Sequence, residues 1–345
     1  MTVTDTPAIP GTRPHRALTR EVLRRCWHPV AFADQVTDRP SSLQLLGEHL
    51  MLRRVADGVT VTQRYCPHRN ADLCDGVTDG GNITCAYHGW TFDGAGRCVD
   101  IPTEGPGAPI SPKAHLRSYR CEVRHNLVWV LLDDDPLSEI PDWPEADDPD
   151  YRFYHADPVP IDTSAGRLLE NFLDVSHFPF VHTDTFGDTT MPKATPFEVH
   201  RDDAGLTFHY SYLAANPDTS SVAGAAHVQR EMLYQLEPPF SGRLVIEYDQ
   251  GRHVIMLAIR PVTETSSEVL FSFARNFDHH RRVEELIAWD LAIFEEDRTI
   301  LEHQHPKELP LDVENSMHVR SDRGTVQYRL ALRTLIERHH AAPGL

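Results

Sequence analysis

Short extended runs of hydrophobic residues characterise the first half of the chain. Residues 50–55 and 59–65 are two such runs, and Ala56-Asp57-Gly58 between them has the residue types of a hairpin turn. Residues 126–132, NLVWVLL, form a third run that is typical of a buried strand. This half of the chain therefore predicts a small all-β domain.

Longer extended runs follow in the second half, which ends in a helical pattern. The runs cover residues 206–213, 227–236, 243–248, 253–260 and 268–277, with a hairpin turn at 249–251. From Arg281 to His303 the apolar positions recur at helical spacing. The stripe consists of Val283, Leu286, Ile287, Ile293, Phe294, Ile300 and Leu301. We predict an antiparallel sheet with a long helix lying on it, so the fold class is α+β.

An acidic, proline-rich segment separates the two patterns. Residues 133–150, DDDPLSEIPDWPEADDPD, have the composition of a surface linker, and we expect the domain boundary there. The predicted division is a solvated N-terminal arm at 1–25, a first domain at 26–135, a linker at 136–150 and a second domain at 151–345. The arm contains several arginines, but its acidic residues and prolines argue against a transit peptide.

The composition is that of a globular protein, and its charge excludes some partners. Of 345 residues, 40% are hydrophobic and 24% are charged. No run of about 18 apolar residues and no continuous signal-peptide core occurs, so neither a membrane span nor secretion is expected. The net charge of −18 opposes binding to nucleic acid. Six cysteines are too few for a disulfide scaffold here and favour a reducing cytoplasm, where paired cysteines more often bind metal.

The stretch ENFLDVSHFPFVH, residues 170–182, is a candidate metal site within the second domain. A helix is expected to begin near residues 162–164, whose side chains can cap it, and to end at Pro179. His182 would then lie in the turn beyond the helix, and this break lets His177 and His182 converge on one ion. A single histidine in apolar surroundings is more often a core residue, so the stretch alone leaves both interpretations open.

Two short loops in the first domain each supply one cysteine and one histidine. Cys66-Pro67-His68 is followed by Cys85-Ala86-Tyr87-His88. Two thiolates and two imidazoles suit either tetrahedral zinc or a Rieske [2Fe–2S] centre, where two cysteines bind one iron and two histidines bind the other. Each loop is mixed, as expected of two loops around a dinuclear cluster. The remaining cysteines are expected to be small buried residues: Cys26, Cys74, Cys98 and Cys121.

The residues around these loops resemble the Rieske family. The family's loops run C-P-H-R and C-x-Y-H-G-W-x-F-D, and this chain has CPHR at 66–69 and CAYHGWTFD at 85–93. The resemblance implies that one Rieske [2Fe–2S] cluster is bound by Cys66, His68, Cys85 and His88.

The whole chain resembles the oxygenase (alpha) subunit of Rieske non-haem iron oxygenases, because the second domain carries N-x-x-D-x-x-H-x-x-x-x-H. The resemblance implies a helix-grip catalytic domain with one mononuclear Fe(II). Two histidines and one carboxylate hold such an iron in a facial triad that leaves positions open for O₂. His177 and His182 match the two histidines of that motif.

The third iron ligand is expected in the C-terminal helix. At about 100° per residue, Asp297 falls within the apolar stripe, whereas Glu295 points away and Glu296 lies at its margin. A carboxylate on a buried stripe needs a partner, and metal ligation would supply one. Asp290 lies on the same stripe and is the competing candidate. The resemblance to the family's Glu-Asp pair favours Asp297, and we expect Glu295 and Glu296 to form a solvated acidic turn.

Two further residues of the motif have roles implied by the resemblance. Asp174 would bridge the metal centres, accepting hydrogen bonds from His88 of the partner subunit and from His177. This arrangement implies a head-to-tail ring, commonly a homotrimer in the family. Asn171 is expected either to lie close to the iron or to serve as a structural amide.

The resemblance also implies a reaction. An NAD(P)H-dependent flavin/iron–sulfur reductase would supply electrons, directly or through a ferredoxin, and O₂ would be the co-substrate. The chain length and motifs resemble the branch with vanillate O-demethylase and dicamba monooxygenase. We therefore expect monooxygenation, either hydroxylation or O- or N-demethylation, of an aromatic or heterocyclic small molecule.

Three alternatives remain open from the sequence. They are an aromatic-ring dihydroxylating dioxygenase, a Rieske electron-transfer protein without oxygenase activity, and a zinc-stabilised ligand-binding protein. Spacing identifies no pocket residue. Several strand residues could contact a carboxylate or phenolate, although each is expected to be an ordinary strand residue: His209, His227, Arg230, His253 and Arg275.

Overall fold

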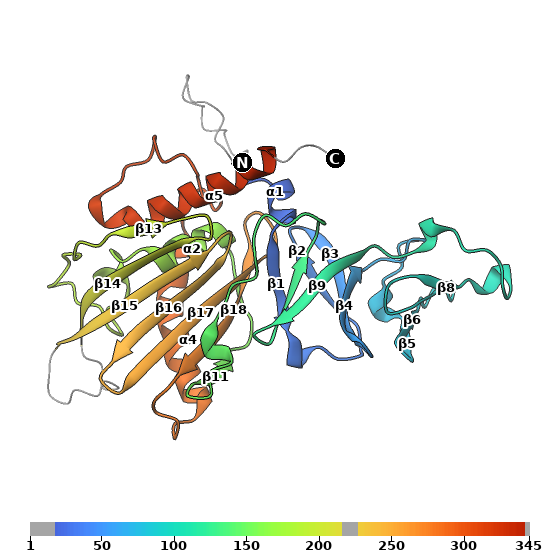
Figure 1. The fold of residues 1–345 in the computed structure, drawn as a ribbon, viewed down its shortest axis with the longest axis horizontal. Helices are drawn as coiled ribbons and strands as arrows, with labels where there is room; N and C mark the ends of the chain where they lie inside the picture. The colour runs from blue at the N-terminus through green and yellow to red at the C-terminus, as the bar shows by residue number, and fades with distance from the viewer. Residues whose placement is uncertain (1–17, 216–226, 342–345) are drawn as a thin grey trace, which may run out of the picture.

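Three antiparallel sheets follow one another along the long axis of the molecule (Figure 1). The structure, a computed structural model, describes residues 18–215 and 227–341. The predicted α+β class is confirmed, with β-structure alone in the first domain except for short helical turns, and a sheet with long helices in the second. Most of the predicted N-terminal arm lies outside the described residues, and its final part forms α1 (Arg20–Arg24), which buries Val22 and Leu23.

The first domain contains a six-stranded and a four-stranded sheet. The six-stranded sheet has the order β1 (Trp27–Phe32), β10 (Leu127–Leu131), β9 (Ser118–Arg124), β4 (Gly58–Gln63), β3 (Glu48–Val55) and β2 (Ser41–Leu45). The four-stranded sheet contains β5 (Val77–Asp79), β6 (Asn82–Thr84), β7 (Thr91–Phe92) and β8 (Cys98–Asp100). The predicted hairpin is confirmed, because Val55 on β3 pairs with Gly58 on β4.

The buried side chain of Arg53 joins these two sheets. Its guanidinium donates to the carbonyl oxygens of Gly81 at 2.6 Å and Asp93 at 3.0 Å, while Arg53 itself belongs to β3. Backbone carbonyls are therefore the partners that allow this cation to be buried. The contact fixes the four-stranded sheet, which carries the second Cys/His loop, against the larger sheet.

The second domain is built on an eight-stranded sheet. Its order is β11 (Arg152–His155), β18 (Ser267–Arg275), β17 (Gly251–Pro261), β16 (Ser241–Tyr248), β15 (His227–Glu237), β14 (Leu206–Ala215) and β13 (Val199–Arg201), and β12 (Val159–Ile161) also pairs with β18. The five predicted strands and the antiparallel arrangement are confirmed. On β14 the buried positions alternate strictly, so one side of that strand faces the core.

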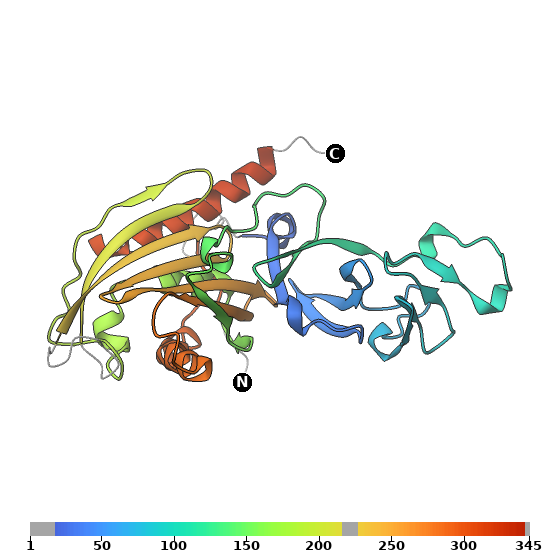
Figure 2. The same ribbon diagram turned by 60° about the horizontal axis from the view of Figure 1, so that its bottom comes forward.

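Helices cover this sheet on one face and along one edge (Figure 2). The helices are α2 (Ala165–Leu173), α3 (Phe178–Val181), α4 (Val283–Leu301) and α5 (Arg323–Ala341). The predicted helix over 281–303 is confirmed as α4, except that Ile300 of the predicted stripe is 48% exposed. The sequence did not predict α5, which packs on α2, β13 and β14. Short 3-10 turns lie at 33–35, 73–75, 102–104, 112–114, 144–146 and 320–322.

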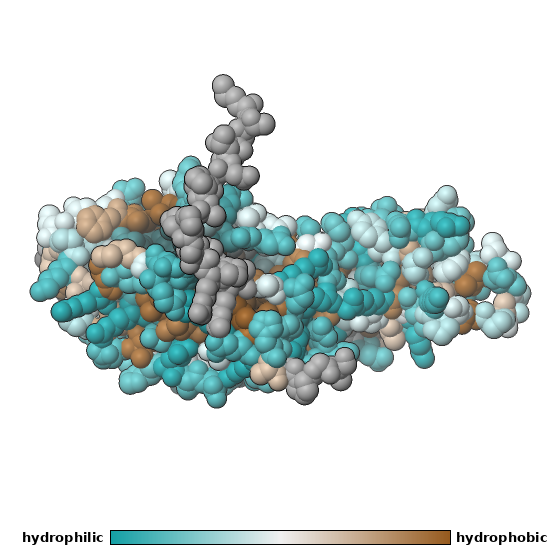
Figure 3. Space-filling view, turned by 90° about the horizontal axis from the view of Figure 1, so that it is seen from above, coloured by the Kyte–Doolittle hydropathy of each residue, from teal (hydrophilic) through white to brown (hydrophobic). Residues whose placement is uncertain are grey.

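The acidic, proline-rich segment runs between the two domains and contributes to their common core. Trp143 is fully buried beside Trp129, and Glu145 pairs with the buried Arg243 of β16. The domain limits expected from the sequence stay a prediction. No helix in the described part of the chain is long and apolar enough to cross a bilayer. Hydrophilic side chains predominate on the face seen in Figure 3.

Candidate metal centres

The helix that leads into the candidate metal site begins where the sequence predicts and ends earlier. The hydroxyl of Ser164 accepts the backbone N–H of Arg167 at 3.2 Å and so caps α2. The helix ends at Leu173 and not at Pro179, so the predicted end is wrong.

The break lies at Asp174, because its carboxylate competes with the helix for backbone donors. Oδ1 of Asp174 accepts the backbone N–H of Ser176 at 2.7 Å. Pro179 instead lies in the first turn of α3, where its missing N–H is tolerated. His177 and His182 flank α3 at its two ends.

Three side chains meet around one point. Nε2 of His177 lies 3.0 Å from Nε2 of His182, and these atoms lie 3.3 Å and 3.6 Å, respectively, from Oδ1 of Asp297 on α4. Within the described residues this is the group of three His, Cys, Asp or Glu side chains whose ligand atoms lie within 4.8 Å of one another. The convergence of the two histidines and the position of Asp297 agree with the predicted geometry.

These distances fit a single cation. Ligand atoms that each lie about 2.1 Å from one metal and subtend 90–120° at it are about 3.0–3.6 Å apart. Three ligands of this kind occupy one side of the ion and leave the other side open. Without a metal, the two facing Nε2 atoms could share only one proton between them, so a cation accounts for both lone pairs.

The neighbouring polar residues distinguish Asp297 from Asp290, the competing candidate for the third iron ligand. Asp290 pairs with His253 at 2.9 Å and is not among the three converging side chains, although it shares the buried side of α4 with Asp297. Asn171 of α2 donates a hydrogen bond to Oδ1 of Asp297 at 3.2 Å. Asn171 therefore holds the carboxylate in place.

Glu296 was expected on a solvated acidic turn, and that prediction is wrong. Its side chain is 14% exposed, and Oε2 lies 2.9 Å from Nδ1 of His182. It also accepts hydrogen bonds from the Thr185 hydroxyl at 2.8 Å and the Asp184 N–H at 3.2 Å. The contact fixes the His182 ring with Nε2 directed at the converging group. Glu295, with a 55% exposed side chain, pairs with Arg298 on the surface.

Burial and the neighbouring carboxylates shift the pKa values of the two histidines in opposite directions. Burial disfavours the charged His177 ring, but Asp174 and Asp297 outweigh that effect and raise the pKa of His177 to about 9. Burial lowers the pKa of His182. A cation at this point would replace the proton on His177 as the positive charge facing Asp297.

The two Cys/His loops have the same backbone conformation. In the first, the N–H of Cys66 donates to Ala71 O at 2.9 Å, and the N–H of Asn70 donates to Cys66 O at 2.9 Å. In the second, Cys85 donates to Trp90 O at 2.8 Å and Gly89 donates to Cys85 O at 3.0 Å. Asn70 and Gly89 are equivalent positions, and both have positive φ. Two matched loops thus present one cysteine and one histidine each.

The side chains of these loops fit an iron–sulfur cluster. Cys66 and Cys85 are buried, and the rings of His68 and His88 have centroids 4.5 Å apart. Burial raises the pKa of the Cys66 thiol to about 11, a penalty that cationic iron would offset. Nδ1 of His68 is buried without a hydrogen-bond partner while Trp90 stacks on the ring, so a metal would satisfy this nitrogen.

The loops and the converging group lie in different domains. Figure 1 shows the four-stranded sheet at one end of the long axis, and α2 and α4 beside the eight-stranded sheet in the other half of the molecule. Asp174 lies beside the converging group, with Oδ2 3.8 Å from Nδ1 of His177 and a side chain that is one-third exposed. One edge of this carboxylate is thus available at the surface.

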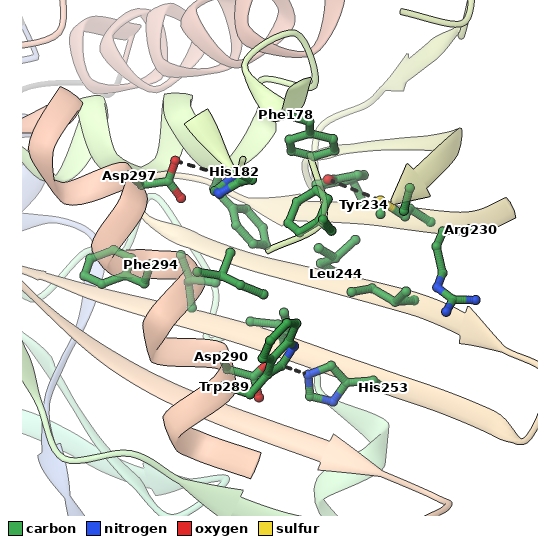
Figure 4. Close-up of a pocket in the computed structure, with 18 of the residues that line it drawn as sticks. Phe178, His182, Arg230, Tyr234, Leu244, His253, Trp289, Asp290, Phe294 and Asp297 are labelled. Carbon is green, nitrogen blue, oxygen red and sulfur yellow. Dashed lines mark hydrogen bonds and ion pairs between the residues drawn. The ribbon is translucent and has the colours of Figure 1, made fainter. Parts of the chain in front are cut away.

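A cavity of about 160 Å³ adjoins the converging group, between α2, α4 and the face of the eight-stranded sheet (Figure 4). Most of its walls are apolar or aromatic, including Phe172, Phe178, Tyr234, Leu244, Ile255, Phe273 and Phe294. Of the five strand residues considered from the sequence, Arg230 and His253 line it. Arg275 pairs with Asp278 and His227 with Asp188, while His209 is exposed.

Known proteins resemble this chain in sequence and in fold. Residues 161–338 match the vanillate O-demethylase oxygenase C-terminal domain, and residues 26–120 match the Rieske [2Fe-2S] domain. Methylxanthine N1-demethylase NdmA of Pseudomonas putida is 33% identical, over 93% of this chain and 91% of that protein. The toluene-4-sulfonate monooxygenase system iron-sulfur subunit TsaM1 of Comamonas testosteroni is 31% identical, over 91% of this chain and 97% of that protein. The structure of Pseudomonas putida CBB5 NdmA with caffeine has a TM-score of 0.81 at 30% identity and covers 93% of both chains.

The fold and the two candidate centres define an oxygenase component in which an iron–sulfur domain is joined to a catalytic iron domain. The chain belongs to the Rieske non-haem iron oxygenases, with a catalytic domain of the vanillate O-demethylase type. It is an oxidoreductase that uses O₂, and its cofactors are a Rieske [2Fe–2S] cluster and a mononuclear iron. These findings favour the oxygenase over the electron carrier and the zinc-stabilised binding protein.

Proposed function

We propose that this chain binds its mononuclear iron through His177, His182 and Asp297 and oxidises a small molecule in the adjoining cavity. The observation that carries the proposal is the set of 3.0, 3.3 and 3.6 Å separations among the three ligand atoms, at the wall of an apolar cavity. With iron bound there, the site supplies O₂ activation next to the substrate.

The protein's own residues position the ligands and exclude water. Glu296 holds the His182 ring, Asn171 holds the carboxylate of Asp297, and aromatic side chains such as Phe178 close the cavity around the site. The ligand atoms are therefore fixed before substrate binds, and the apolar walls favour an aromatic or heteroaromatic ring.

We further propose that Cys66, His68, Cys85 and His88 hold the Rieske cluster and that electrons cross between subunits. The four-stranded sheet that carries the second Cys/His loop lies far from α2, which ends beside Asp174 (Figure 1), and this supports transfer from a partner subunit in a head-to-tail trimer. The partly exposed Asp174 would accept a hydrogen bond from His88 of the partner subunit. Electrons would then pass through Asp174 to His177, which lies beside it. An NAD(P)H-dependent flavin/iron–sulfur reductase, with or without a ferredoxin, would supply the electrons. The cytoplasmic location expected from the sequence stays a prediction.

The reaction that we propose is monooxygenation, with demethylation as its main form. The relatives that support it are the methylxanthine N-demethylase NdmA and the sulfonate monooxygenase subunit TsaM1. In demethylation, one atom of O₂ enters a methyl C–H bond, and the other leaves as water with two electrons and two protons. The hydroxylated methyl group then departs as formaldehyde, and the ring oxygen or nitrogen keeps a proton.

A single-turnover assay tests this function. The reduced enzyme is mixed with O₂ and methoxylated, N-methylated or unmodified aromatics, and formaldehyde and hydroxylated products are measured. We expect formaldehyde from a methylated substrate, at no more than one equivalent per iron site. A cis-dihydrodiol as the main product, or oxidation of the cluster without any oxidised substrate, would contradict the proposal.

A further inference from the structure

Arg230 on β15 is a buried cation that the iron site does not use. The buried positions of β15 alternate, and Arg230 shares the inward side with Val228, Met232, Tyr234 and Leu236. It is 6% exposed and lines the cavity, at one end of which Figure 4 shows it. Its guanidinium carbon lies 4.3 Å from the centre of the Tyr248 ring, so a cation–π contact holds the group in place.

No carboxylate among the described residues pairs with Arg230, whereas the other charged groups around Tyr248 have partners. Arg275 contacts Asp278 at 3.4 Å, and Asp290 contacts His253 at 2.9 Å. A buried cation without a counter-ion is strongly unfavourable. The planar guanidinium is also the group best suited to bind a carboxylate or sulfonate through two parallel hydrogen bonds. An anionic ligand would therefore complete this end of the cavity.

The His253–Asp290 pair adds polar side chains to the wall of the same cavity. The pair lines the same cavity, and Nδ1 of His253 and Oδ2 of Asp290 are both buried without a hydrogen-bond partner. These two atoms have almost no accessible surface, so the pair is a fixed polar part of the cavity wall, and Arg230 is the group that requires an anion. Figure 4 shows this pair and Arg230 away from His182 and Asp297.

The separation of Asp290 from Asp297, the proposed iron ligand, gives the scale of the cavity. Asp290 and Asp297 lie on the same side of α4 and are seven residues apart, which corresponds to about 10 Å along the helix. Apolar side chains, among them Leu244 and Phe273, line the space between. A single aromatic ring with substituents at both ends has about this length.

We propose that the substrate is an aromatic anion whose carboxylate or sulfonate binds Arg230 while its reacting group faces the iron ligands. This inference rests on the proposed function and adds the substrate class to it. The named relatives do not decide the matter, since one acts on methylxanthines and another on toluene-4-sulfonate. Arg230 favours the anionic class.

Calorimetric binding to the oxidised holoenzyme, without reductant, tests the proposal independently of turnover. The probes are 4-methoxybenzoate, toluene-4-sulfonate, the neutral 4-methoxybenzamide and caffeine. We expect one of the anions to bind at least about tenfold more tightly than either neutral probe. Arg230→Gln should weaken the binding of that anion by about 30-fold or more. The same change should alter the affinity for 4-methoxybenzamide by less than about threefold. The relative affinities of the two anions then identify the preferred head group.

Arg252→Gln is the matched control, because Arg252 lies on β17 with a 54% exposed side chain and pairs with Glu247. It should leave all four affinities unchanged. Arg230→Met, which removes the buried charge, should not lower the Tm of the ligand-free enzyme, and this checks that the variants fold. Equal or tighter binding of the neutral probes, or an equal loss of neutral and anionic binding in Arg230→Gln, would overturn the proposal.

Turnover measurements separate this inference from the proposed function. Arg230-dependent anion binding without any oxidised product would contradict the monooxygenation and leave the binding site in place. Oxidation of neutral substrates alone would contradict the binding site and support the monooxygenation.

Discussion

Nδ1 of His182 lies 2.9 Å from Oε2 of Glu296. Glu296 precedes the proposed iron ligand Asp297 in the sequence, and it fixes the ring of a second proposed ligand, His182. Asp297 and Glu296 are adjacent on α4, yet one carboxylate faces the point where the ligands converge and the other lies behind His182. Consecutive helical positions differ by about 100°, which is why two neighbouring carboxylates can serve these different positions.

Glu296→Gln should weaken iron binding without removing it. The amide is a weaker acceptor than the carboxylate for the His182 N–H, and loss of such a partner typically costs about 10- to 100-fold in metal affinity or activity. Iron retained after dialysis against a graded chelator measures the effect. Glu295→Gln is the control, since Glu295 pairs with Arg298 on the surface. Identical chelator resistance in both variants would contradict the role given to Glu296.

Asp174→Asn should leave both metal centres loaded and slow turnover by about 10- to 100-fold. The amide keeps the shape of the side chain but loses the charge that faces His177 at 3.8 Å. Stopped-flow oxidation of the reduced cluster in the presence of substrate measures the transfer directly. Asp184→Asn, which alters an exposed carboxylate nearby, should behave as the unmodified enzyme. A normal rate of electron transfer in Asp174→Asn would contradict the proposal that Asp174 bridges the two metal centres.

Gly242→Ala should destabilise the catalytic domain through α2. A Cβ atom at Gly242 would lie 2.9 Å from Cε1 of Phe172 and 3.1 Å from Cδ1 of Leu169, both of which belong to this helix. Overpacking of this kind costs about 1–3 kcal/mol. Thermal unfolding should therefore show a lower Tm, accompanied by lower iron content because α2 leads into the ligand segment.

Gly94→Ala is the comparison for that change, because its Cβ would make only ordinary contact with Val55 at 3.4 Å. A Tm for Gly242→Ala that equals the Tm for Gly94→Ala would show that the space beneath α2 is not limiting.

The parts of the structure that follow local rules could be predicted from the sequence. The hairpin around Asp57, the strands of the eight-stranded sheet and helix α4 follow short-range patterns, and they are present. The spacing of Cys66, His68, Cys85 and His88 likewise identified the Rieske domain. Helix α5 was missed because it is rich in arginine, although Tyr328, Leu332, Leu335 and Ile336 form a buried stripe at helical spacing.

The remaining features depend on contacts between distant segments. Pro179 was expected to end α2, but Asp174 ends it first, and the proline is accommodated in the next helix. The contact between Glu296 and His182 joins α4 to the end of α3, and Arg230 becomes a cavity residue only through the register of β15 with its neighbours. Local composition gave no means of telling Arg230 from an ordinary strand residue.

The iron content of purified variants tests the central claim most directly. The unmodified enzyme should contain about three iron atoms per chain, two in the cluster and one mononuclear. Asp297→Ala should contain about two and keep the visible spectrum of the cluster. Asp290→Ala should keep all three, because Asp290 pairs with His253 away from the ligand group. Full iron content in Asp297→Ala, or loss of the mononuclear iron in Asp290→Ala instead, would contradict the account.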